Sequence, residues 1–194
     1  MANPSFHGAI LAGGRSSRMG QDKALLTRNG ETLLQRTQRL LQEAGAGEVL
    51  ISRNSGESGY IADSFVDSGP LGGIYSLLRH YRATLPLLVV PVDLPWLVPE
   101  TLSCLVDSGM AHASSCCYDG HPLPLFLYQP IEMVEPLHRA LIQRRSLSVR
   151  NFLAQFPLRY LQATAPETLL NTNTPAEWAR ASMECTGDFL TNER

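Results

Sequence analysis

The sequence predicts a single α/β domain with a mostly parallel central sheet between two helical layers, a three-layer αβα fold. A chain of 194 residues, 44% of them hydrophobic, can bury one good core and is short for two. Apolar strand-like segments also alternate with segments of helical periodicity, beginning with a strand–helix–strand unit over residues 9–52. We assign residues 1–185 to this domain and expect 186–194 to form a flexible C-terminal tail.

Composition excludes several classes of partner. The net charge of −2 creates no overall field that would attract nucleic acid or a membrane surface, so a bound phosphate must be held by local charge. No segment has the length of a transmembrane helix, and the N-terminus has neither a basic region nor an apolar core that would direct export. We therefore expect a cytoplasmic protein.

The first element is a short apolar run, residues 9–12, which passes directly into Gly13 and Gly14. This pattern predicts a buried strand that ends in a loop whose backbone approaches a ligand closely. Arg18 and Lys23 follow within ten residues of the glycines. A strand that leads into a glycine loop with positive charge is typical of phosphate binding in α/β proteins.

Spacing excludes two common types of glycine loop. A P-loop starting at Gly14 would need glycine at Met19, and a dinucleotide fingerprint starting at Gly13 would need glycine at Arg15. The loop is therefore of a third kind.

The next elements complete the first parallel unit. Thr32 and Gln35 have the spacing of a capping box and predict a helix that ends at Gly45. Residues 48–52 form the second predicted strand, and the polar loop 54–59 follows at its carboxyl end. Ligands bind at that edge of open parallel sheets, so this loop is a candidate binding segment.

The most hydrophobic strand of the chain, residues 85–95, follows a predicted helix that begins in the turn-rich segment 67–73. Its nearly continuous apolar character predicts a central strand that is covered on both faces. The strand ends in Asp93, which places a carboxylate at the same edge as the glycine loop. Pro99 then begins a helix that we expect to end at Gly109.

The remaining third of the chain predicts smaller elements. Residues 114–118 and 124–128 form two strands of a small hairpin appended to the sheet, and a helix covers about 131–142. Before the last helix, Thr174 and Glu177 supply a capping box.

The four cysteines contain no CxxC pair, and the adjacent Cys116 and Cys117 have poor geometry for a disulfide, which predicts a reduced protein. A metal site can be built from these two cysteines with His112 and His121. A buried apolar strand that carries cysteines is the ordinary explanation.

The pattern Leu11-Ala-Gly-Gly-x-Ser-x-Arg-Met-Gly-x-Asp-Lys-Ala-Leu25 resembles the signature of nucleotidyltransferases related to molybdenum cofactor guanylyltransferase. Further matches lie at residues 69–73, 91–95 and 171–177. Related cytidylyl- and sugar-nucleotidyltransferases usually begin Leu-Ala-Ala-Gly, so Gly13 favours the guanylyl branch. The resemblance implies a Rossmann-like nucleotidyltransferase fold.

The resemblance also implies an activity: transfer of GMP from GTP to molybdenum-molybdopterin with Mg²⁺ as cofactor and pyrophosphate as product. A cytidylyltransferase on the same pterin, a transferase for another phosphorylated small molecule, and a non-catalytic GTP-binding adaptor in molybdoenzyme assembly remain alternatives. Proteins that deliver molybdopterin or assemble molybdoenzymes are the expected protein partners.

Nucleotidyl transfer needs cations for the triphosphate and a carboxylate for a divalent cation, so we expect catalytic roles for Lys23, Arg18 and Asp93. Asn173 assists Asp93 at the metal, although it could instead be a turn residue. The nucleotide is expected to contact Leu11, Ala12, Gly13, Gly14, Lys23, Asn54, Asp63 and Asp93.

Two of these assignments have competitors. The asparagine of the family aligns with Ser52 or Asn54, and we choose Asn54 because it is the only asparagine in its loop. Asp63 matches by its position before the 69–73 block, but Asp67 is close enough to compete.

The anionic pterin needs cations that lie away from the triphosphate. His121, Arg144 and Arg145 are candidates because they are distant in sequence from the glycine loop. Two exposed arginines at a helix end would explain Arg144 and Arg145 equally well.

Overall fold

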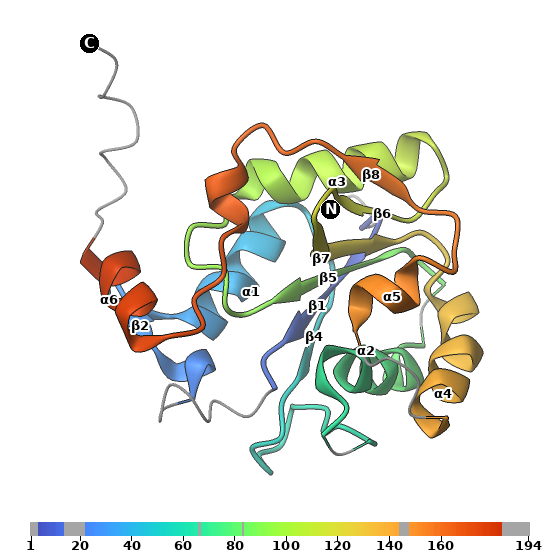
Figure 1. The fold of residues 1–194 in the computed structure, drawn as a ribbon, viewed down its shortest axis with the longest axis horizontal. Helices are drawn as coiled ribbons and strands as arrows, with labels where there is room; N and C mark the ends of the chain where they lie inside the picture. Colours follow the sequence, from blue (N-terminus) through green and yellow to red (C-terminus); the bar gives the residue numbers. More distant parts are fainter. Residues whose placement is uncertain (1–3, 14–21, 66, 83, 144–147, 184–194) are drawn as a thin grey trace.

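The computed structural model describes residues 4–13, 22–65, 67–82, 84–143 and 148–183. Their central element is a six-stranded sheet of order β4-β1-β5-β7-β6-β8 (Figure 1). β7 is antiparallel to both of its neighbours, whereas the other adjacent strands pair in parallel. In spatial order, the strands are Val49–Ser52, His7–Leu11, Leu87–Pro91, His121–Leu127, Cys116–Tyr118 and Arg159–Leu161.

Helices cover both faces of the sheet. α1 and α3 pack with Leu88 and Phe126 on one face, and α2, α4 and α5 pack with Val89 and Leu125 on the other. β5 therefore lies between two apolar layers, as its hydrophobic run predicts, and the three-layer αβα architecture is confirmed. The helices are α1 (Leu33–Glu43), α2 (Gly69–His80), α3 (Pro99–Ala111), α4 (Val134–Ile142) and α5 (Val149–Leu153).

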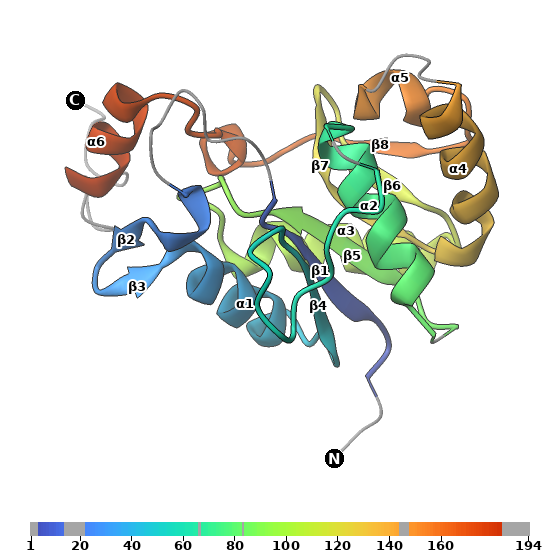
Figure 2. The same ribbon diagram turned by 90° about the horizontal axis from the view of Figure 1, so that it is seen from below.

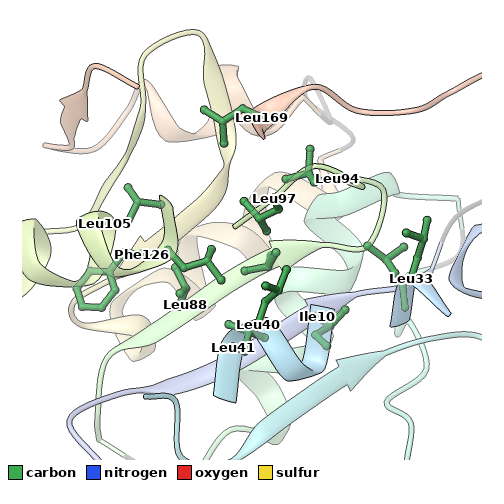
Figure 3. Close-up of a cluster of buried hydrophobic side chains, with 14 of the residues drawn as sticks. Ile10, Leu33, Leu40, Leu41, Leu88, Leu94, Leu97, Leu105, Phe126 and Leu169 are labelled. Carbon is green, nitrogen blue, oxygen red and sulfur yellow. The ribbon is translucent and has the colours of Figure 1, made fainter. Parts of the chain in front are cut away.

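The core between the sheet and the α1–α3 layer consists mainly of interleaved aliphatic side chains, with Phe126 among the aromatic members (Figure 3). Ile10 of β1 and Leu88 of β5 are fully buried and lie among leucines of α1. Leu169 from the C-terminal segment packs against the same cluster. This contact fastens the segment that precedes Asn173 to the body of the molecule.

The predicted capping box of α1 is present. The backbone N–H of Gln35 donates to Thr32 Oγ1 at 3.1 Å, and Thr32 N donates to Gln35 Oε1 at 3.0 Å. The chain leaves the helix at Gly45, whose φ of 92° suits glycine. Local sequence therefore determines both ends of α1.

The expected end of α3 at Gly109 is wrong, because the helix continues to Ala111. Gly109 faces the sheet, where an added Cβ would collide with the ring of Phe126 on β7. The glycine permits close packing of helix against strand and does not terminate the helix. The predicted hairpin is present as β6 and β7, and it belongs to the sheet itself, with β8 added beyond it.

Short elements gather at one end of the molecule. The 3₁₀ helix η1 and the small hairpin β2–β3 lie on the same side as α6 in both views (Figures 1 and 2). Two further 3₁₀ helices lie elsewhere in the chain: η2 directly precedes α4, and η3 lies between β8 and α6. The bounds are η1 (Lys23–Leu25), β2 (Thr27–Arg28), β3 (Glu31–Thr32), η2 (Pro130–Met133), η3 (Pro166–Leu169) and α6 (Pro175–Met183).

Cys116 and Cys117 are buried and unpaired in β6, in agreement with the strand interpretation. Burial raises the pKa of both thiols, to about 12 and about 11, so the thiolate form that binds metals is disfavoured. Within the described ranges, no group of three or more His, Cys, Asp or Glu side chains could hold a metal. None of the described helices is long and apolar enough to cross a membrane.

Candidate functional site

A large cleft lies across the edge of the sheet where β1, β4 and β5 end. It has a volume of about 1510 Å³, and its walls include the segment after β1, the loop after β4 and the first turn of α2. The start of β7 reaches the same edge because that strand runs antiparallel to β5. The topology therefore collects the ends of several strands around one cavity, the usual ligand position in such sheets.

Three predicted site residues meet at one wall of this cleft. The Lys23 ammonium donates a hydrogen bond of 2.8 Å to Asn173 Oδ1 and forms an ion pair of 3.2 Å with Asp93 Oδ2. The residues are separated by 70 and 150 positions in the chain. The side chains of Lys23 and Asp93 are only 17% and 23% exposed, so water screens their attraction incompletely.

Backbone contacts hold Asp93 and Asn173 in place. Val92 N donates to Leu11 O at 3.1 Å, and Thr172 N donates to Asp93 O at 3.0 Å. Glu177 Oε2 accepts from Asn173 N at 2.6 Å, within the predicted capping box of α6. These backbone hydrogen bonds lower the pKa of Glu177, so the carboxylate that holds Asn173 stays ionised near neutral pH.

Two arginines hold the segment after Asp93 by hydrogen bonds to its backbone carbonyls. The buried Arg28 donates to the carbonyl of Pro95, and Arg36 donates to the carbonyls of Pro95 and Leu97 at 3.3 and 2.8 Å. Burial lowers the pKa of Arg36, with repulsion from Arg28 as the next cause. The segment that carries Asp93 is thus held through its own carbonyls.

A second polar group lines the cleft next to Gly13. Asn54 Nδ2 donates to Asp63 Oδ2 at 3.1 Å, and Asn54 Oδ1 accepts from Asp63 N at 2.7 Å. Ser52 Oγ donates to the other carboxylate oxygen at 3.0 Å. Both residues that compete for the family asparagine therefore bind Asp63, Ser52 from a buried position and Asn54 from an exposed one.

The backbone explains why Asp63 reaches this position. Ile61 pairs with Ser52 in an isolated parallel bridge, so the chain returns alongside β4 two residues before Asp63. A Cβ on Gly13 would lie 3.7 Å from Asp63 Oδ2 and 3.8 Å from Asn54 Nδ2. Gly13 therefore leaves open space directly above this pair. Asp67 also lines the cleft, but its side chain is exposed.

Arg53 is a site residue that the sequence interpretation missed. Its side chain is 8% exposed, and the guanidinium donates to Asp22 Oδ2 at 2.8 Å and lies 5.2 Å from the centre of the Tyr60 ring. The hydrogen bond to Asp22 raises the pKa of Arg53, and burial opposes this effect. Its position next to Asn54, after β4, could have indicated Arg53 as a site residue. No local pattern indicates Asp22 as the partner of Arg53.

The remaining assignments divide into two groups. Leu11 and Ala12 are buried and line the cleft, and His121 and Leu123 of β7, the strand next to β5, line it as well. The turn before His121 is held by Arg150, which donates to Gly120 O at 2.6 Å. Gly14, Arg18, Arg144 and Arg145 lie outside the described residues.

The oxygens of Asp93 and Asn173 fit a hard divalent cation, because carboxylate and amide oxygens are ligands that Mg²⁺ accepts. Both oxygens already face one positive charge, the Lys23 ammonium. This group of oxygens therefore stabilises cations, whereas the Asp63–Asn54 pair offers hydrogen-bonding groups to the same cleft. Together, the fold and this site define an α/β nucleotide-binding protein of the nucleotidyltransferase type.

Comparison with known proteins is consistent with this class. The chain matches the family model described as MobA-like NTP transferase domain over residues 8–172. It is 38% identical over 176 residues to a molybdenum cofactor guanylyltransferase from Xanthomonas euvesicatoria, with 89% of this chain and 92% of the relative covered. A guanylyltransferase from Sinorhizobium fredii is 32% identical, with coverage of 89% and 88%. The chain belongs to the MobA-like NTP transferase family.

Solved structures share the fold. Molybdopterin-guanine dinucleotide biosynthesis protein A from Archaeoglobus fulgidus has a TM-score of 0.71 at 22% identity, covering 91% of this chain and 96% of that one. A 2-C-methyl-D-erythritol 4-phosphate cytidylyltransferase from Thermus thermophilus has a TM-score of 0.67 at 17% identity, with the same coverage. At these identities, the likeness concerns the fold alone.

Proposed function

We propose that this protein transfers GMP from GTP to molybdenum-molybdopterin, with formation of the guanine dinucleotide cofactor and pyrophosphate. The observation that carries the proposal is the convergence of Lys23, Asp93 and Asn173 at the carboxyl edge of the sheet, in the same cleft as the Asp63–Asn54 pair. This convergence occurs in a chain whose curated relatives are named molybdenum cofactor guanylyltransferases.

The reaction needs little covalent chemistry from the protein. An oxygen of the pterin's terminal phosphate attacks the α-phosphorus of GTP, the new P–O bond forms, and the bond to the bridging oxygen breaks with its electron pair leaving on pyrophosphate. A phosphate monoester is largely ionised near neutral pH, so no side chain has to remove a proton. The protein's task is to align the reactants and stabilise charge.

Each wall of the cleft has a part in this alignment. Lys23 supplies a positive charge for the triphosphate. Asn54 and Asp63 offer hydrogen-bonding groups to the base or ribose beneath Gly13, where no Cβ blocks their approach. His121 and Leu123 of β7 face the acceptor, with Arg144 and Arg145 as additional candidates for its anionic groups.

Asp93 and Asn173 would hold Mg²⁺, which neutralises charge on the α-phosphate and the departing pyrophosphate when it is bound. Their oxygens satisfy the preference of this cation for hard ligands. A single carboxylate is adequate because substrate phosphates and water complete the coordination of Mg²⁺ in most nucleotide sites.

The deciding experiment is a panel of GTP, CTP and ATP with molybdenum-molybdopterin, with and without Mg²⁺, in which pyrophosphate release is measured. We expect release with GTP and Mg²⁺. Release with CTP but not GTP would identify a cytidylyltransferase, and GTP binding without turnover would identify an adaptor that presents the cofactor to assembly proteins in the cytoplasm.

Asp93→Asn provides the matching test of the site. We expect kcat for GTP to fall about 100-fold or more, because removing one transition-state charge partner has effects of this size. Asp107→Asn is the control, since Asp107 is an exposed carboxylate on α3. Equal activity of both variants would remove Asp93 from the mechanism.

A further inference from the structure

The contacts of Lys23 point to a role beyond phosphate binding. Its ammonium donates to both oxygens that suit a divalent cation, Asp93 Oδ2 at 3.2 Å and Asn173 Oδ1 at 2.8 Å. A divalent cation on these same oxygens would lie next to the ammonium that donates to them, and the repulsion between the two positive charges disfavours its binding. The ammonium and the metal therefore compete.

We propose that Lys23 fills the cation site in the nucleotide-free protein, so that the divalent cation binds there only after a triphosphate has drawn the ammonium away. The proposal deepens the proposed function, because it relies on the triphosphate as the ligand of Lys23. Metal binding is thereby coupled to the nucleotide, because the cation site becomes available only when the triphosphate binds.

The surroundings of Lys23 allow such a switch without movement of the backbone. Asp22, the preceding residue, is held by Arg53 at 2.8 Å and accepts a hydrogen bond of 2.9 Å from Ala24 N. The start of η1 is thus fixed on both sides of Lys23. The long flexible side chain can move its ammonium from the carboxylate to a phosphate while its Cα stays in place.

Charge favours the transfer once the triphosphate is present. Asp93 offers one negative charge and Asn173 offers a neutral amide oxygen, whereas a triphosphate carries several negative charges on adjacent groups. The ammonium therefore gains attraction by moving, and Asp93 is left to the incoming cation. In the nucleotide-free state, the same ion pair neutralises a carboxylate whose side chain is only 23% exposed.

The test measures Mn²⁺ binding by electron paramagnetic resonance in the absence of nucleotide, with Mn²⁺ as a probe for the Mg²⁺ site. We expect Lys23→Met to bind Mn²⁺ about tenfold more tightly than the unaltered protein, since removal of one like charge a few ångströms away has an effect of this order. Lys23→Gln, which is also neutral, is expected to shift the affinity in the same direction.

Two matched variants make the result specific. Arg79→Met removes a positive charge from the exposed last turn of α2, whose first turn lies at the cleft, and is expected to leave Mn²⁺ affinity unchanged. Adding Asp93→Asn to Lys23→Met is expected to abolish the gain. Unchanged affinity in both Lys23 variants, an equal gain in Arg79→Met, or a gain that survives Asp93→Asn would each overturn the proposal.

The measurement is independent of the proposed activity because it contains no nucleotide and no pterin. Failure of GTP turnover would leave the Mn²⁺ result intact, and a failed Mn²⁺ result would leave GTP turnover intact. Thermal melting of each variant confirms that it is folded at the temperature of the measurement.

Discussion

At the scale of single residues, the candidate site depends on side chains that are small as well as on those that are charged. Gly13 has space where any other residue would place a Cβ above the Asp63 carboxylate. Gly73 on α2 is placed more tightly, since a Cβ there would lie 3.1 Å from Ser52 Oγ. Gly73 therefore permits the close approach of α2 to the hydrogen-bonded group formed by Ser52, Asn54 and Asp63, whereas Gly13 leaves the space above Asp63 and Asn54 open.

Gly13→Ala is expected to weaken ligand binding without a change in the stability of the fold. The added Cβ meets protein atoms at ordinary van der Waals distances of 3.7 and 3.8 Å, so we expect an unchanged melting temperature. The methyl group occupies space above Asp63 and Asn54, and we expect the KM for GTP to rise about tenfold, the equivalent of about 1.4 kcal/mol. Steady-state kinetics with GTP and CTP test this, and an unaltered GTP preference would contradict a base site beneath Gly13.

At the scale of elements, packing between α3 and β7 depends on Gly109. Glycine disfavours a helix interior by about 1 kcal/mol relative to alanine, which is why local sequence suggests a helix end there. The structure shows the compensating contact: the backbone of α3 approaches the Phe126 ring so closely that no Cβ fits. Tertiary packing outweighs the local preference.

Gly109→Ala is therefore expected to destabilise the fold despite its better helix propensity. Overpacking of a core costs about 1–3 kcal/mol, and the gain in propensity offsets only part of it. Urea denaturation measures the difference, with Cys104→Ala on the exposed side of α3 as the control. A variant that is more stable than the unaltered protein would show that α3 can shift away from Phe126 at little cost.

At the scale of the whole molecule, a chain of polar contacts spans the mouth of the cleft. Asp63 binds Asn54, the adjacent Arg53 binds Asp22, and the adjacent Lys23 binds Asp93. Successive contacts join residues 9, 31 and 70 positions apart. The loop after β4 is thereby held to the segment that carries Asp22 and Lys23, and both line the cleft.

The Arg53–Asp22 pair is expected to act through Lys23. Arg53→Met and Asp22→Asn should each weaken binding of a fluorescent GTP analogue, and the double variant should lose less than the sum, with a coupling energy of about 1 kcal/mol. Arg53→Lys should recover part of the affinity because it keeps the charge. The control is Arg39→Met on α1, which breaks surface ion pairs with Glu31 of β3 and Glu43 of α1. Strictly additive losses would show that the pair does not couple the two segments.

Several elements could be predicted because their signals are local. The capping boxes at Thr32 and Thr174 involve residues three positions apart, and the apolar run of β5 records burial on both faces. β8 escaped prediction because it is a three-residue edge strand whose pairing with β6 depends on distant residues. Arg53 was not predicted as a site residue because its role depends on Asp22, which lies 31 positions away in the chain.

By itself, the sequence determined the fold class, the carboxyl edge as the place of the site, and Lys23, Asp93 and Asn173 as candidates, since these follow from periodicity, spacing and family pattern. Tertiary structure decided that the three side chains meet, that Asn54 and Ser52 share Asp63, and that Arg53 holds Asp22. Periodicity reports which face of an element is buried. Contacts across 150 positions depend on how the layers pack, and no local pattern encodes that packing.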